Sequence, residues 1–234
     1  MAWPAPWRRW PSQCAVCQGW GNGRICIRCT TRFAAPVDRC RRCAVRVVSG
    51  VAICGGCVRK PPSFDSAVAA VDYSHPWDRV ISDFKYRNGL DLADALCDLL
   101  MAAQRPNTGE RPDCLLPVPL GRQRLRERGY NQSWELARRC ARRLGCHTDS
   151  AMLLRIRETP HQLSLPRERR MANVRGAFAI EPTRRPEVVG RSIGLIDDVM
   201  TTQATADELS QVLLNAGALS VQVWVVARTP APEH

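Results

Sequence analysis

Eight cysteines between residues 14 and 57 restrict the fold of this chain more than any other feature of its sequence. They form four C-x-x-C pairs: Cys14 and Cys17, Cys26 and Cys29, Cys40 and Cys43, and Cys54 and Cys57. Two thiolates separated by two residues in a turn can point at one tetrahedral metal ion. Four such pairs in one stretch therefore predict a cysteine-rich double zinc-ribbon module over residues 1–60, with two structural Zn²⁺ ions.

The way in which the pairs combine is open at this stage. Tandem pairing is the simplest, but interleaved pairing would use the same residues. An iron–sulfur cluster also uses this spacing and ranks below zinc, whereas a redox C-x-x-C would need only one pair. The other cysteines lie in helix-like or strand-like surroundings and are expected to be ordinary buried thiols. They are Cys97, Cys114, Cys140 and Cys146.

Length and apolar pattern narrow the class of protein further. The 234 residues suffice for one α/β domain and a small additional module. No apolar run is long enough to span a bilayer, and the first ten residues lack the apolar core of a signal peptide. We therefore expect a cytoplasmic protein that does not insert into membranes.

A second domain is predicted over residues 64–230. Lys60-Pro61-Pro62-Ser63 is typical of a stiff linker, and beyond it strand-like and helical patterns alternate. This alternation predicts an α/β fold, a mostly parallel sheet flanked by helices. Residues 146–190 break the alternation and are expected to form an excursion over the sheet. The expected strands cover residues 66–73, 114–119, 193–197 and 221–227, and the expected helices lie near residues 92–100, 134–144 and 204–215.

The stretch at residues 193–205 has the composition of a ligand site. An apolar run ends in Asp197 and Asp198, and a threonine-rich turn and a helical pattern follow. Ligands of open α/β sheets bind beyond the carboxyl ends of the strands, and the start of a helix offers free N–H groups to a phosphate. Carboxylates suit sugar hydroxyls or a divalent cation, so the combination indicates a ribose 5-phosphate. A purely structural alternative is that Thr205-Ala206-Asp207-Glu208 forms a helix capping box.

The same stretch resembles the phosphoribosyl-diphosphate (PRPP) motif of type I phosphoribosyltransferases, in which an apolar strand and two acids precede a Thr-Thr-Gly-x-Thr loop. More narrowly, the chain resembles the ComF family over nearly all of its length after residue 13. This resemblance implies a type I phosphoribosyltransferase-like fold with a hood. The matching segments are the four cysteine pairs, Pro117-Val118-Pro119-Leu120, Arg128-Gly129-Tyr130-Asn131-Gln132, Thr159-Pro160-His161-Gln162, Arg169 to Asn173, and Gly176-Ala177-Phe178.

The resemblance also implies roles for single residues. Asp197 and Asp198 would hold the ribose hydroxyls and orient Mg²⁺, and Arg169 in the hood would approach the diphosphate, which makes these three the candidate catalytic residues. The phosphate loop would consist of Thr201, Thr202, Gln203, Ala204 and Thr205. The diphosphate would lie beside Val118 and Pro119, with Arg128 near the leaving group.

Gln203 departs from the family motif, because it stands where the motif has glycine. If this position requires a positive φ, glutamine costs about 1–2 kcal/mol there. If it does not, the longer side chain would instead crowd the phosphate. Lys85 and Tyr86 form a further basic and aromatic group that matches the family, with an exposed helix end as the structural alternative.

The charge distribution indicates a second class of ligand. Residues 1–60 hold eleven basic residues and one acid, whereas the rest of the chain is nearly neutral. A basic module of this kind favours an anionic partner such as single-stranded DNA.

Members of the ComF family are linked to DNA uptake in competent bacteria. We therefore favour a PRPP-binding protein of DNA uptake or DNA metabolism, with a protein of the competence machinery as a further partner. The alternatives are a nucleic-acid-binding protein that keeps the PRPP fold without turnover, an active phosphoribosyltransferase of nucleotide metabolism with an unknown acceptor, and a purely structural zinc module.

Overall fold

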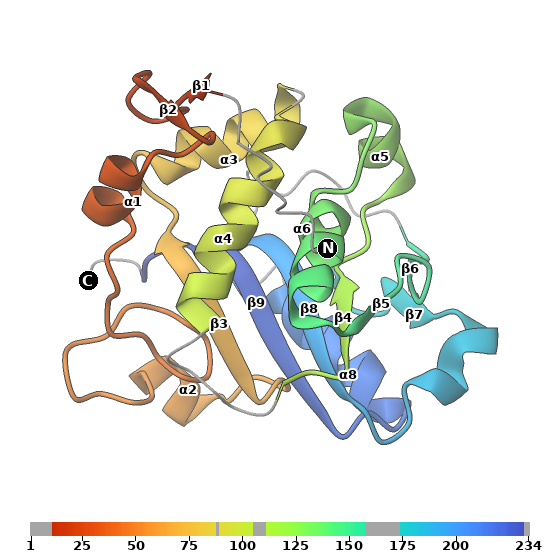
Figure 1. Ribbon diagram of the computed structural model, residues 1–234. Coiled ribbons are helices and arrows are strands. Elements are labelled where there is room, and N and C mark those ends of the chain that lie inside the picture. The colour runs from red at the N-terminus through yellow and green to blue at the C-terminus, as the bar shows by residue number, and fades with distance from the viewer. Residues whose placement is uncertain (1–10, 88, 105–110, 158–173, 232–234) are drawn as a thin grey trace, which may run out of the picture.

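The computed structural model describes residues 11–87, 89–104, 111–157 and 174–231. Its centre is a five-stranded parallel sheet in the order β3-β9-β8-β4-β5 (Figure 1). Helices cover both faces of this sheet, so the two central strands are buried on both sides and read as continuous apolar runs. The predicted fold class is confirmed. The strands are β3 (Ser66–Asp72), β4 (Cys114–Pro117), β5 (His147–Thr148), β8 (Ser192–Met200) and β9 (Ser220–Arg228).

Three helices cover one face of the sheet: α3 (Trp77–Tyr86), α4 (Ala93–Gln104) and α6 (Gln132–Leu144). A short 3₁₀ turn, η1 (Leu90–Leu92), leads into α4. The side chain of Asn131 accepts a hydrogen bond from the Ser133 N–H and so caps α6. Gly145 ends this helix in the left-handed conformation, as its sequence predicts.

The opposite face is covered by α8 (Ala204–Asn215) and by an antiparallel hairpin of β6 (Leu153–Arg155) and β7 (Phe178–Ile180). The 3₁₀ helix η4 (Pro182–Glu187) follows the hairpin. The hairpin belongs to the predicted excursion at residues 146–190. Two of its family-like segments, Thr159 to Gln162 and Arg169 to Asn173, lie outside the described residues.

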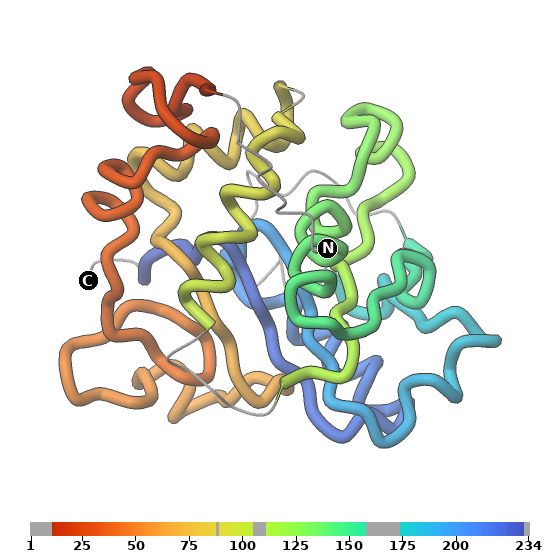
Figure 2. Tube along the Cα trace, in the orientation of Figure 1, coloured from red at the N-terminus to blue at the C-terminus, as the bar shows by residue number. Residues whose placement is uncertain are grey.

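The cysteine-rich residues form two units along one side of the molecule (Figure 2). The first contains β1 (Pro11–Gln13), β2 (Trp20–Asn22) and α1 (Ile27–Phe33), and it contacts α3 through a hydrogen bond of 2.8 Å from Trp77 Nε1 to the Phe33 carbonyl. The second contains α2 (Gly55–Arg59), and its Ala44 is fully buried in the same core cluster as the residues of α8. Both units therefore pack directly on the α/β domain.

One further helix, α5 (Arg122–Arg128), lies between β4 and α6 in the chain. Within the described ranges, every helix is too short or too polar to cross a bilayer.

Candidate ligand site and metal centres

The two candidate carboxylates lie within β8. The sequence predicts that this strand ends at Asp197, but its pairing with β9 continues through Val199 and Met200. The prediction of the strand end was therefore wrong. Val199 and Met200 are apolar, so they can pair with Ala227 and Arg228 of β9 and pack against the core. Asp198 is buried and Asp197 is half-buried. The sheet thus holds both acids more rigidly than a loop would.

Each carboxylate has a partner from a helix on the α3–α6 face. Lys85 Nζ, at the end of α3, lies 2.8 Å from Asp198 Oδ1. Ser133 Oγ, in the first turn of α6, donates a hydrogen bond of 3.0 Å to Asp197 Oδ1. The backbone N–H of Asp198 donates to the same oxygen at 2.9 Å. These contacts fix the orientation of both side chains.

Burial and neighbouring charges shift the pKa values of Asp197 and Lys85. Burial raises the pKa of Asp197 to about 7, and the neighbouring Asp198 carboxylate acts in the same direction. Burial opposes the charge of Lys85, but the Asp198 carboxylate outweighs burial and holds the pKa of the ammonium above its ordinary value. The site therefore pairs one ammonium with one carboxylate, while the second carboxyl group titrates near neutral pH.

A pocket opens beside Asp197. Its lining includes Val118 and the whole loop at residues 201–205. The loop leads directly into α8, whose first N–H groups have no partner within the helix. Hydroxyl groups of Thr201, Thr202 and Thr205 add further donors. The pocket therefore combines a carboxylate on one wall with a helix start on the other.

Gln203 has a φ of +70° and is the residue that precedes α8. The position thus requires the left-handed conformation for which the family motif has glycine. No side chain caps the helix. Asp207 instead accepts a hydrogen bond from the Ser63 N–H, and Glu208 accepts one from the Gly176 N–H. The structural alternative of a capping box at residues 205–208 is wrong.

The remaining predicted residues are distributed around this pocket. The carbonyl of Val118 accepts a hydrogen bond of 3.1 Å from Asn131 Nδ2, which ties the end of β4 to the cap of α6. Pro119 follows Val118 and is half-buried. Neither Pro119 nor Arg128 lines the pocket among the described residues. Arg169 lies outside the described residues.

Arg128 contacts the end of α3 and the start of α6. Its guanidinium lies 4.7 Å from the centre of the Tyr86 ring and donates to the Tyr86 hydroxyl and to Gln132 Oε1. Gln132 Nε2 in turn donates to the Lys85 carbonyl at 3.4 Å. Arg128 therefore supports the segment that carries Lys85.

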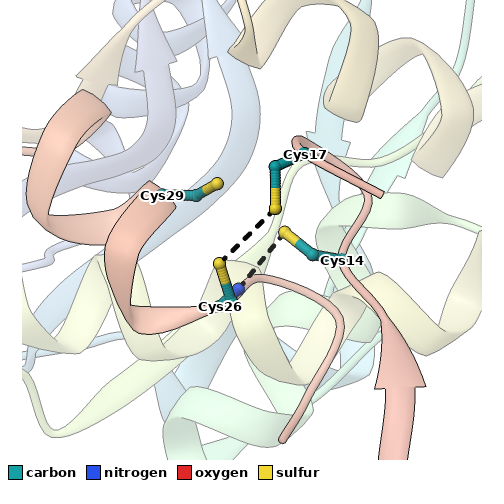
Figure 3. Close-up of side chains that lie close together, drawn as sticks. All are labelled: Cys14, Cys17, Cys26 and Cys29. Atoms are coloured by element: carbon teal, nitrogen blue, oxygen red, sulfur yellow. Dashed lines mark hydrogen bonds between the residues drawn. The ribbon is translucent and has the colours of Figure 1, made fainter. Parts of the chain in front are cut away.

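The eight cysteines form two separate clusters, Cys14, Cys17, Cys26 and Cys29, and Cys40, Cys43, Cys54 and Cys57. The sulfurs of each cluster lie within 4.8 Å of one another, and those of the first converge on one point (Figure 3). This arrangement matches the tandem pairing and excludes the interleaved one. Four thiolates around one point are the ligand set of a structural zinc site.

Both clusters share the same backbone geometry. The N–H of Cys26 donates to Cys14 Sγ at 3.3 Å, and the N–H of Cys54 donates to Cys40 Sγ at 3.2 Å. Burial works against the thiolate of Cys14, but backbone N–H groups of Cys17, Cys26 and Val16 lower its pKa to about 6. Such donors favour the deprotonated sulfur that a metal ion needs.

Sequence reasoning missed Ser133 and assigned no partner to Lys85. The apolar spacing of Trp77, Val80, Ile81 and Phe84 is a helical signal that could have located α3. Lys85 reaches Asp198 because α3 packs on β8, and no local sequence pattern indicates this contact.

Comparison with known proteins gives clear relatives. No protein-family model matches the chain. DNA utilization protein YhgH of Escherichia coli O157:H7 is 34% identical, over 94% of this chain and 98% of its own length. Competence protein F of Haemophilus influenzae is 29% identical, over 92% of this chain and 96% of its own length. The solved structure of glutamine PRPP amidotransferase from Bacillus subtilis, complexed with ADP and GMP, aligns with 60% of this chain and 26% of its own, at 20% identity and a TM-score of 0.36.

Proposed function

The chain belongs to the ComF family, which includes DNA utilization protein YhgH and competence protein F, and from this premise we propose that it binds PRPP with Mg²⁺ at the pocket beside β8. One observation carries the proposal. Asp197 and the helix-leading loop at residues 201–205 line the same pocket. A ligand that fills it must offer an anion to the loop and hydroxyl groups to the acid, and a ribose 5-phosphate does both.

The phosphate end of the ligand belongs at the loop. The free N–H groups and the positive dipole end of α8 attract an anion, and the threonine hydroxyls add donors. The carboxylates repel a phosphate, so the phosphate lies on the loop side of the pocket. The ribose hydroxyls then donate to Asp197 and Asp198.

Mg²⁺ fits the donors present. Carboxylate oxygens are hard ligands of the kind that Mg²⁺ prefers, and this ion keeps much of its coordination for water and for ligand oxygens. The carboxylate of Asp198 already pairs with Lys85. The two acids would therefore supply only part of the coordination of Mg²⁺, and PRPP oxygens would supply another part. When bound, Mg²⁺ stabilises negative charge on the diphosphate. The chain's own residues hold the ribose and the 5-phosphate in place.

Zn²⁺ is the metal that we assign to both cysteine clusters, because four sulfurs and N–H donors surround each centre. We retain the division into a zinc module at residues 1–60 and a phosphoribosyltransferase-like domain at residues 64–230, and a cytoplasmic location.

A role in handling single-stranded DNA is the second part of the proposal. Trp20 is 76% exposed, and Arg28 and Arg32 are exposed on α1 of the same cysteine unit. An exposed indole and exposed basic residues in one unit suit base stacking and phosphate contacts. Phe33, the last residue of α1, packs against the core and the His75 ring and is not available for stacking.

Calorimetry on the full chain tests PRPP binding. We expect saturable binding of PRPP in the presence of Mg²⁺, and we expect Asp197→Asn with Asp198→Asn to abolish it. Asparagine keeps the shape of each side chain but removes a charged acceptor, at about 1.5–3 kcal/mol per hydrogen bond. Circular dichroism would confirm that the variant folds. Undiminished binding by a folded double variant would show that this ribose phosphate site is misassigned.

A further inference from the structure

Arg228, at the end of β9, joins the second cysteine unit to the phosphate loop. Its side chain is buried, with 5% of the residue exposed. Nε donates a hydrogen bond of 2.9 Å to the carbonyl of Cys43, which is one of the candidate metal ligands. Nη1 donates to the carbonyl of Met200 at 2.9 Å and to that of Thr201 at 2.6 Å. One rigid guanidinium thus contacts a metal-ligand peptide and the first peptides of the loop.

Because the Arg228 guanidinium is buried, its position depends on the carbonyl groups to which it donates hydrogen bonds. A buried charge is tolerated only when hydrogen bonds replace its hydration, and the fork of a guanidinium fixes the directions of those bonds. The carbonyl of Cys43 is held in place by the turn that also positions the Cys43 sulfur, and the next residue, Ala44, has a φ of +56°. A change in metal ligation that moves this turn therefore displaces the bond to Arg228.

We propose that Arg228 is a positioning residue through which metal binding at the cluster of Cys40, Cys43, Cys54 and Cys57 sets the geometry of the loop at residues 201–205. The inference rests on the proposed function, because the consequence of a displaced loop is weaker binding of the PRPP 5-phosphate. The metal centre would thereby act on the ligand site as well as on the stability of its own unit.

The two units provide a matched pair of variants. Cys26 and Cys54 occupy equivalent places, since each precedes a short helix and donates its N–H to the first sulfur of its cluster. Within the described ranges, the hydrogen bond and the ion pair that join the first unit to the domain reach α3 and η1, not the loop. Cys54→Ser should therefore disturb the loop, and Cys26→Ser should not.

Arg39 supplies a second control. Its Nη1 donates to the carbonyl of Ala44 at 3.1 Å and pairs with Asp72 of β3 at 2.6 Å. It thus ties the same turn to β3, whereas Arg228 ties it to the loop. Arg39→Met removes the bridge from this turn to β3. Arg228→Met removes the bridge from the turn to the loop. Arg228→Lys keeps the positive charge at position 228 but lacks the forked hydrogen-bond donors of the guanidinium.

Hydrogen exchange of the peptide spanning residues 199–206, measured on full chains prepared with Zn²⁺, is the direct readout. We expect faster exchange for Cys54→Ser, Arg228→Met and Arg228→Lys, and wild-type exchange for Cys26→Ser and Arg39→Met. Combining Cys54→Ser with Arg228→Met should add nothing to the effect of either change alone. Equal exchange in the Cys54→Ser and Cys26→Ser chains, additive effects in the combined variant, or an unaffected loop in both Arg228 variants would overturn the proposal.

PRPP affinity is the second readout. We expect the Arg228→Met chain to bind PRPP about tenfold more weakly than the wild type, since the change removes the donor to the carbonyls of Cys43 and Thr201, and the Arg39→Met chain to bind within about twofold. If the wild-type chain binds no PRPP, the proposed function fails, but the exchange measurement still decides whether Arg228 links the two parts.

Discussion

At the scale of single residues, the site depends on a balance of charge that three side chains share. Asp197 and Asp198 are adjacent in β8, and Lys85 supplies the ammonium that makes their proximity tolerable. Ser133 and the backbone N–H of Asp198 hold Asp197 in a fixed orientation. A ligand therefore meets carboxylates that are already positioned, which reduces the entropic cost of binding.

We expect Gln203→Gly to raise the free energy of unfolding by about 1 kcal/mol, because glycine adopts a positive φ without the steric cost that glutamine has. PRPP binding should also tighten if the glutamine side chain crowds the phosphate. Urea denaturation and calorimetry measure the two effects. Gln203→Ala is the control, since it shortens the side chain but keeps the strained backbone. Equal stabilisation by alanine and glycine would show that strain is not the cause.

The raised pKa of Asp197 predicts that PRPP binding depends on pH. Ligand hydroxyls and Mg²⁺ favour the ionised carboxylate, so binding below the pKa of about 7 must release the proton of Asp197. Affinity should increase as the pH rises toward 7 and level off above it. Calorimetry at a pH about one unit below this pKa, in two buffers of different ionisation enthalpy, measures the released proton. Binding at this pH without proton release would contradict the assignment.

At the scale of elements, the sequence predicted the order of the elements at the candidate site better than the contacts that support them. The order of β8, loop and α8 follows from an apolar run, a threonine-rich turn and a helical pattern, all of which are local. The length of β8 was misjudged because carboxylates usually end a strand, whereas here Lys85 and Ser133 make them tolerable inside one. Those partners come from α3 and α6, so only tertiary packing reveals them.

The cysteine units were predicted well because metal spacing is also a local signal. Their attachment to the domain was not, since the buried bridges of Arg39 and Arg228 join residues far apart in sequence. Nothing in the pattern around Ala44 indicates that it completes the core on the α8 face of the sheet.

We expect the chain as purified to hold about two equivalents of Zn²⁺, one for each cluster of four thiolates. Cys26→Ser and Cys54→Ser should each lose about one equivalent, because a structural zinc site needs all four ligands. Elemental analysis by mass spectrometry measures the content. Iron in place of zinc, or no metal in protein prepared without oxygen, would contradict the assignment.

At the scale of the whole molecule, the basic excess and the candidate PRPP site lie on different parts of the chain. The basic excess belongs to residues 1–60, while the carboxylates and the loop at residues 201–205 belong to the α/β domain. Both cysteine units contact elements of the ligand site, the first through α3 and the second through Arg228. Binding of an anion to the module can therefore be studied only in the full chain.

We expect Arg28→Ala with Arg32→Ala to weaken binding of single-stranded DNA and to reduce the slope of log affinity against log salt by about 0.7 for each phosphate that is no longer neutralised. Trp20→Ala should weaken binding at every salt concentration without changing that slope, because it removes stacking. Fluorescence anisotropy at several salt concentrations measures both. The exposed pair Arg142→Ala with Arg185→Ala removes the same charge outside the module. An equal weakening in that control would mean that the module has no special role.

The central claim is that the 5-phosphate of PRPP lies at residues 201–205, and phosphorus NMR of PRPP with Mg²⁺ and the full chain tests it most directly. The 5-phosphate and the diphosphate give separate resonances. We predict that the wild-type chain shifts the 5-phosphate resonance and that Thr205→Val reduces this shift, because the variant lacks the hydroxyl donor at the start of α8. A 5-phosphate resonance that stays at its free position while the diphosphate resonances move would contradict the account.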